Sequence, residues 1–147
     1  VRLGAEWYGV PLAFVQEVVR VGPRAFLPSA PRGVAAIMSV RGSIHSITDI
    51  KQFCGIPSGA SDDRQRVVIV QCQALRTGLL VDEVSEIAAI PASSLEPPLP
   101  TLSAEQKPFI THVARWHEHL IALLDIEKII MRSRGNVAPV GEGGNEL

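Results

Sequence analysis

The sequence contains little of what disulfide-held, metal-held or membrane-embedded folds require. Cys54 and Cys72 are the two cysteines among 147 residues, too few and too far apart for a zinc ribbon or a disulfide framework. Free cysteine is among the most buried residue types, so both are expected to be buried thiols of a cytoplasmic protein. The sequence has no apolar run of about 18 residues, the length of a membrane-spanning helix. Its first residues also lack the charged-then-apolar order of a signal peptide.

A concentrated positive charge is missing as well. Lys and Arg total 14 against 15 Asp and Glu, the net charge is -1, and the basic residues are scattered. Because phosphate binding needs a basic face, nucleic acid is excluded as the main partner. No glycine-rich loop follows a strand and opens a helix to bind phosphates. The hydrophobic fraction of 46% with 20% charge is instead typical of a soluble globular protein with a real core.

What the sequence does contain is a series of short Val- and Ile-rich segments between turn signals, the pattern of a barrel or sandwich. Strands are expected in segments 6–12, 14–21, 36–40, 43–50, 67–72, 77–90, 109–115 and 119–126. They fall into two groups, before and after a polar loop at 58–66. Within one segment Val81, Val84 and Ile87 recur every three residues, which we interpret as a bulged or coiled strand.

The segments between the strands are predicted from their prolines, glycines and caps. Residues 24–33 contain two prolines and are expected to form an irregular link. Residues 91–108 contain five prolines and are expected to cross the surface. One helical turn should end at Gly55, and a helix capped by Asp125 should follow the last strand. The Gly-rich residues 135–147 are predicted to be a disordered tail.

Polar side chains within segment 43–50 resemble parts of a hydrolytic site. Ser43, His45 and Asp49 share one face of an extended strand, and Ser46 lies on the other. Residues four apart along a strand are about 13 Å apart, so His45 cannot bond Asp49 directly. The G-x-S-x-G pattern of a nucleophile elbow is also absent. We therefore expect a strand with two mixed faces and no catalytic activity.

Three histidines suggest an alternative function, a metal-dependent enzyme or metal sensor. His112, His117 and His119 surround the last predicted hairpin, and histidines two apart on a strand can bind one metal. However, His117 and His119 flank the predicted turn, where polar residues are common, and no Cys or carboxylate completes a four-ligand shell. Exposed turn histidines are the simpler interpretation, and we expect no metal or other cofactor.

Two charges are embedded in apolar sequence. Glu17 lies inside segment 14–21, and Arg41 directly precedes the turn residue Gly42. A charge among strand residues is costly unless it is satisfied. Either both charges lie on a solvated face, or they pair with each other or mark an interaction surface. Their spacing alone does not choose between these interpretations.

The order of the segments resembles the CheW-like chemotaxis coupling proteins, of which this chain is identified as a divergent member. The resemblance covers about residues 1 to 132 and is carried by four stretches, at 3–21, 27–55, 67–87 and 109–130. It implies a mainly β fold of two packed five-stranded SH3-like barrels with short helices, one of them C-terminal. The domain would span 1–134, with its two halves dividing near 58–66 and the tail at 135–147.

The resemblance also implies a function and a set of site residues. The family members are non-catalytic adaptors that couple chemoreceptors to the regulatory domain of the histidine kinase CheA, and the receptor tip lies along a groove between the barrels. Such a protein is cytoplasmic and is recruited to membrane-associated receptor arrays. Glu17 and Arg41 match a charged pair on the family's receptor-facing side. The matching apolar partner-binding positions are Val18, Ile37, Val40, Val81 and Val84, and the matching turn and strand positions are Gly42, Asp49, Gly78 and Asp82.

Four residues depart from the family's central signature, namely Ala36, Ser39, Ser46 and Thr48. The turn before Gly78 also lacks the usual glycine and is one residue short. These changes leave the core strands intact, so the fold is expected to survive while partner contacts change. The resulting hypothesis is an adaptor of an alternative chemosensory pathway that binds only one of the two usual partners.

Overall fold

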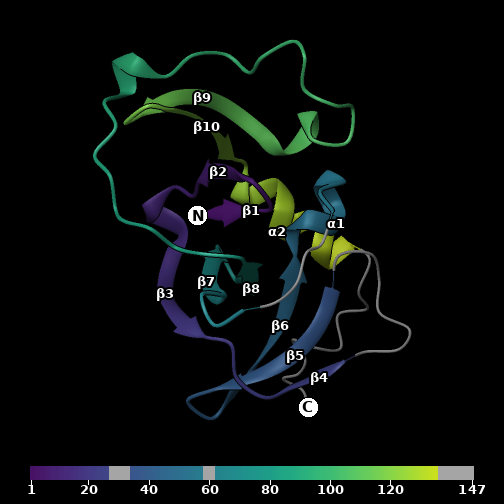
Figure 1. The fold of residues 1–147 in the computed structure, drawn as a ribbon. Coiled ribbons are helices and arrows are strands. Elements are labelled where there is room, and N and C mark those ends of the chain that lie inside the picture. The colour runs from purple at the N-terminus through teal and green to yellow at the C-terminus, as the bar shows by residue number, and fades with distance from the viewer. Residues whose placement is uncertain (27–33, 58–61, 136–147) are drawn as a thin grey trace.

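The computed structural model describes residues 1–26, 34–57 and 62–135 and shows a mainly β protein with short helices (Figure 1). The described strands are β1 (Arg2–Leu3), β2 (Glu6–Gly9), β3 (Val15–Arg20), β4 (Arg24–Phe26), β5 (Val34–Val40), β6 (Ser43–Asp49), β7 (Arg66–Cys72), β8 (Leu75–Val81), β9 (Ile110–Trp116) and β10 (His119–Leu124). The described helices are α1 (Ile50–Cys54) and α2 (Ile126–Gly135), with 3-10 turns η1 (Leu12–Phe14), η2 (Ala92–Ser94) and η3 (Lys107–Phe109). The mainly β class and the C-terminal helix agree with the prediction, whereas most of the predicted tail lies outside the described residues.

Strand pairing differs from the predicted two five-stranded barrels. Among the described residues, one sheet has four strands in the order β1-β2-β10-β9, and the other has six in the order β3-β7-β8-β6-β5-β4. The loop at 58–66 separates β6 from β7, which belong to the same sheet, so the sheets do not divide there. Instead the N-terminal strands join the C-terminal hairpin through a parallel pairing of β2 with β10.

Two segments differ from their predicted structure. Residues 24–26, expected within an irregular link, form β4 and pair antiparallel with β5. They precede the prolines at 28 and 31, which lie outside the described residues, so their N–H groups are available to a ladder. The strand expected over residues 77–90 ends at Val81, because the N–H of Asp82 leaves the sheet and donates to the carbonyl of Arg2 at 2.9 Å.

Gly55 ends α1 and Asp125 caps α2, as predicted, whereas the cap that Asp49 forms on α1 was not predicted. Asp49 Oδ1 accepts a hydrogen bond from the N–H of Lys51 at 3.1 Å, and Gly55 closes α1 with a φ of 65°. At α2, Asp125 Oδ1 accepts from the N–H of Lys128 at 3.0 Å. The caps therefore fix α1 at the end of β6 and α2 at the end of β10.

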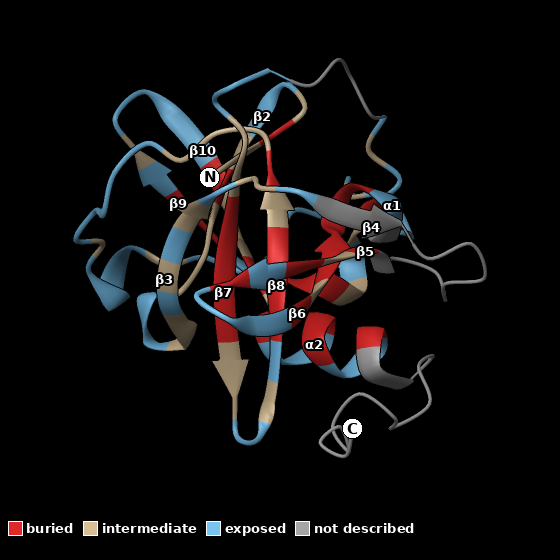
Figure 2. Ribbon diagram, turned by 90° about the horizontal axis from the view of Figure 1, so that it is seen from below, coloured by how far each residue is buried: buried red, intermediate tan, exposed pale blue. Residues whose placement is uncertain are grey.

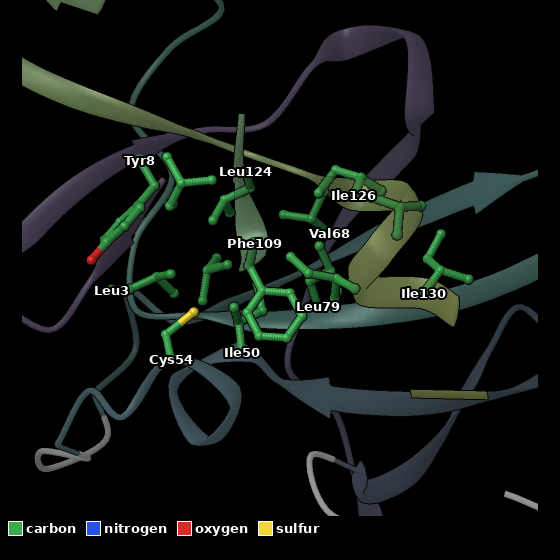
Figure 3. Close-up of a cluster of buried hydrophobic side chains, with 14 residues drawn as sticks. Leu3, Tyr8, Ile50, Cys54, Val68, Leu79, Phe109, Leu124, Ile126 and Ile130 are labelled. Carbon is green, nitrogen blue, oxygen red and sulfur yellow. The ribbon is translucent and has the colours of Figure 1, made fainter. Parts of the chain in front are cut away.

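Apolar side chains form two clusters on opposite faces of the six-stranded sheet. The main core lies between this sheet, α2 and the four-stranded sheet, and it includes Leu3, Tyr8, Ile50, Leu79, Phe109, Leu124 and Ile126 (Figure 3). A small core fills the inside of the curled sheet and consists of Ala36, Met38, Val40, Ile47, Val67 and Ile69. Because β7 contributes to both cores, it is buried on both faces (Figure 2).

Gly78 allows the small core to close. A Cβ at this position would lie 2.5 Å from Val67 Cγ1 and 2.9 Å from Ile47 Cδ1. Any side chain would therefore push β8 away from its neighbours.

Of the two cysteines, Cys54 lies in the main core, where burial raises the pKa of its thiol to about 11. Cys72 is only half-buried, which corrects the prediction for that residue.

Candidate protein-binding site

The structure brings Glu17 and Arg41 together. Arg41 Nη2 lies 3.2 Å from Glu17 Oε1, with the side chains 79% and 31% exposed, respectively. Arg41 and Gly42 form the β5–β6 turn with φ values of 52° and 84°, the positive values that a type I′ turn requires. Arginine rarely adopts this left-handed conformation. The turn directs a strongly exposed guanidinium toward β3.

A β-bulge places Glu17 opposite Arg41. The register of β3 shifts between Val15 and Glu17, which pair with Val70 and Ile69 of β7. Val15 consequently packs on the main core. Glu17 shares its face with Ile69, on the side of the small core. No periodicity in the sequence signals this bulge.

The predicted apolar partner-binding residues divide into accessible and buried ones. Val18 is 45% exposed, and Ile37 and Val84 are half-buried, so a partner can contact all three. Val40 belongs to the small core and Val81 to the main core, where both are buried. In this structure Val40 and Val81 therefore contribute to the cores, and their predicted contact with a partner stays a prediction.

Two of the signature departures, Ser46 and Thr48, share Thr77 as a hydrogen-bond partner. Thr77 Oγ1 lies 3.1 Å from Ser46 Oγ and 2.9 Å from Thr48 Oγ1. Thr48 Oγ1 also lies 3.2 Å from Ser133 Oγ on α2. Buried hydroxyls need such partners, and these four link β6, β8 and α2. Neither Thr77 nor Ser133 was predicted, although Ser133 continues the buried stripe of α2 seven residues after Ile126.

The strand 43–49 cannot form a hydrolytic site. His45 pairs with Met38 and lies on the inner face of the sheet, whereas Ser46 bonds Thr77 on the outer face. Burial lowers the pKa of His45, the positive charge of Arg76 lowers it further, and Glu17 acts in the opposite direction. Asp49 is buried and caps α1. The side chains that resembled a catalytic set thus serve separate structural contacts.

The histidines of the last hairpin pack on an aromatic side chain. The Trp116 ring lies 4.8 Å from the His117 ring and 5.6 Å from the His119 ring, measured between centroids. Glu86 Oε2 accepts a hydrogen bond from Trp116 Nε1 at 3.0 Å and lies 3.3 Å from His117 Nε2. These two contacts hold the pKa of Glu86 below its usual value. In the described residues no group of three or more His, Cys, Asp or Glu side chains could hold a metal ion.

Asp82 forms a second ion pair, which is buried. Lys51 Nζ lies 2.9 Å from Asp82 Oδ1, and their side chains are 5% and 14% exposed. The Gly4 N–H donates to Asp82 Oδ2 at 2.7 Å. Burial by itself would raise the pKa of Asp82, but the hydrogen bonds from Lys51 and Gly4 hold it below its usual value. This pair links α1 and the end of β8 to the β1–β2 turn of the other sheet.

The exposed Arg41–Glu17 pair and the accessible Val18, Ile37 and Val84 are the candidate protein-binding residues of this fold. No helix among the described residues is long and apolar enough to cross a membrane. The chain belongs to the CheW-like domain family, whose model matches residues 1–134. As a member of this family it is a non-catalytic scaffold of chemotaxis signalling.

Individual relatives support this assignment. The chain is 24% identical over 128 residues to the chemotaxis protein CheW of Rhizobium meliloti, covering 87% of this chain and 83% of that one. It is 30% identical over 109 residues to protein PilI of Pseudomonas aeruginosa, covering 74% of this chain and only 61% of PilI. Among solved structures, the scaffolding protein TtCheW from Thermoanaerobacter tengcongensis matches with a TM-score of 0.75 and 29% identity, over 84% of each chain.

Proposed function

We propose that this chain is an adaptor of a bacterial chemosensory array that binds the cytoplasmic tip of a chemoreceptor through Arg41 and Glu17. The exposed ion pair between them carries this proposal, because arginine is enriched at the centres of protein interfaces. The accessible apolar residues Val18, Ile37 and Val84 are the further partner-binding positions that the family implies. In this role the protein works at membrane-associated receptor arrays, with a CheA-type kinase as the second partner that the family implies.

Partner choice is a finer part of the proposal. Among the four signature departures, Ala36, Ser46 and Thr48 are buried or bonded within the protein, and Ser39 alone is exposed. A protein that binds only one of receptor and kinase would therefore owe this restriction to Ser39 rather than to Ser46 or Thr48. Normal affinity for both partners would rule out the restriction and leave the adaptor function intact.

The experiment is calorimetric titration of the purified chain with a chemoreceptor tip fragment and, separately, with a kinase regulatory domain. Arg41→Gln should weaken receptor binding at least tenfold, or about 1.4 kcal/mol, because it removes the charge. Arg115→Gln is the control, since Arg115 is exposed on β9, a strand at the other end of the molecule from the β5–β6 turn (Figure 1). Unchanged receptor binding by the Arg41 variant, or loss of its cooperative unfolding, would contradict the proposed role.

A further inference from the structure

The inner face of the six-stranded sheet carries apolar side chains in the small core and polar side chains next to it. Side chains alternate along strands, so the face that carries Ile47, Ile69 and Gly78 continues to the residues two positions away. The register places Gln71 opposite Arg76 and Glu17 opposite Ile69, and Arg41 reaches Glu17 from the β5–β6 turn. We call this group the polar rim, and it consists of Glu17, Arg41, His45, Gln71 and Arg76.

Arg76 is held within the polar rim by a neutral group. Its Nη2 donates to Gln71 Oε1 at 2.9 Å and its Nε to the same atom at 3.2 Å. Gln71 Nε2 in turn donates to the carbonyl of Gln73 in the β7–β8 turn at 2.9 Å. No carboxylate of the described residues lies within 4 Å of the Arg76 guanidinium. Gln71 thus holds the Arg76 side chain in place, and no counterion for its charge lies among the described residues.

The polar rim therefore carries more positive than negative charge. It contains the guanidiniums of Arg41 and Arg76 and a single carboxylate, that of Glu17. The Ser46–Thr77 hydrogen bond of 3.1 Å holds β6 beside β8 next to His45 and Arg76. Accordingly, the charges of both Arg76 and Glu17 act on the His45 ring.

We propose that the polar rim is a docking site for a carboxylate side chain of the bound receptor, with Arg76 and Arg41 as its ligands. The charge excess favours an acidic occupant, and a guanidinium binds a carboxylate through two parallel N–H donors. Glu17 occupies one edge of Arg41, whose guanidinium has five donors in all. This proposal rests on the proposed function, which it refines by naming the chemistry of the partner.

The test measures binding of the full chain to a chemoreceptor tip fragment at low and high salt. Arg76→Glu should weaken binding at least tenfold and Arg76→Gln about threefold to tenfold, because a rim charge pair is lost or reversed. The Arg76→Gln variant should also show a smaller loss of affinity on adding salt than the unmodified chain. Arg115→Glu, an exposed change in the other sheet, should stay within about twofold. Thermal unfolding of each variant verifies that the fold is retained.

Two outcomes separate this proposal from the adaptor function. If Arg41→Gln weakens binding and Arg76→Glu does not, the polar rim is not the docking site and the adaptor function stands. If the unmodified chain does not bind the fragment, the adaptor function itself fails. In the last experiment, each acidic residue of the fragment is replaced in turn by lysine, and binding to the Arg76→Glu variant is measured. One of these replacements should restore binding, because it restores a pair of opposite charges. If none restores it, the occupant is not a carboxylate.

Discussion

Two ion pairs of similar length have opposite surroundings. Lys51–Asp82 joins atoms 2.9 Å apart and is almost completely buried, whereas Arg41–Glu17 joins atoms 3.2 Å apart with Arg41 79% exposed. The difference shows that distance alone does not reveal what an ion pair does. A buried pair is strongly destabilising to break, because the remaining charge is left in a poor solvent. An exposed pair contributes only about 0 to 1 kcal/mol to the free energy of unfolding. A partner can therefore contact its atoms at little cost to the fold.

Their contacts within the fold differ in the same way. Asp82 accepts hydrogen bonds from α1 through Lys51 and from the β1–β2 turn through Gly4, and so it connects the two sheets. Arg41 contacts Glu17 across the open end of one sheet only. Breaking the first pair should therefore affect folding, and breaking the second should affect binding.

The largest effect is expected for Lys51→Met, which leaves the Asp82 charge unpaired. We expect a loss of about 3 to 5 kcal/mol in the free energy of unfolding, measured by urea titration. Lys128→Met is the matched control on the exposed side of α2 and should change stability by at most about 0.5 kcal/mol. The double variant Lys51→Met/Asp82→Asn should recover part of the loss because no charge is left buried. A single-variant loss near that of the control would show that Asp82 is solvated.

A smaller loss of stability is expected for Asp82→Asn. The free energy of unfolding should fall by about 1.5 to 3 kcal/mol at pH 7, the range for a hydrogen bond to a charged group. Because the pKa of Asp82 is lowered in the folded protein, its contribution is complete above the unfolded value of about 3.9. It is lost as the pH falls through the lower folded value. The stability difference between the unmodified chain and the variant should therefore be constant from pH 7 to about 5 and shrink under stronger acid.

Asp49 provides a control whose stability should depend on pH in the opposite direction to that of Asp82. Burial raises the pKa of its carboxyl, with the Lys51 N–H and charge opposing, so the charged form is disfavoured by folding. Asparagine is an equally good helix cap, which makes Asp49→Asn a conservative comparison. As the pH falls, the unmodified chain should gain stability relative to this variant. Parallel pH profiles for the two variants would contradict the assigned surroundings of both carboxyls.

Local features were predictable from the sequence, whereas the site's long-range contacts were not. The Arg41–Gly42 turn and the Asp125 cap depend on neighbouring residues, and the structure contains both. The pairing of Lys51 with Asp82 spans 31 positions, and that of Thr48 with Ser133 spans 85. Such contacts depend on which strands become neighbours in the sheet. The spacing of residues within one segment does not predict which strands these are.

The sequence singled out Glu17 and Arg41, but it did not predict the geometry that brings them together. The two embedded charges were expected either to pair or to be solvated, and their pairing depends on the bulge between Val15 and Glu17. Burial of Val40 and Val81 follows from which face of each strand meets a core. Strand alternation fixes relative faces but does not say which face is inside. The role of Arg76 became visible only from its register with Gln71.

The smallest stability effect is expected for Arg41→Gly, and two opposing terms explain it. Removing the ion pair costs at most about 1 kcal/mol. Glycine relieves the left-handed conformation at φ 52°, which costs other residues about 1 to 2 kcal/mol. Its greater freedom in the unfolded chain offsets part of this relief. The free energy of unfolding should therefore stay within about 0.5 kcal/mol, while receptor binding weakens as for Arg41→Gln. A loss above about 2 kcal/mol would make Arg41 a structural residue and remove its contrast with Lys51.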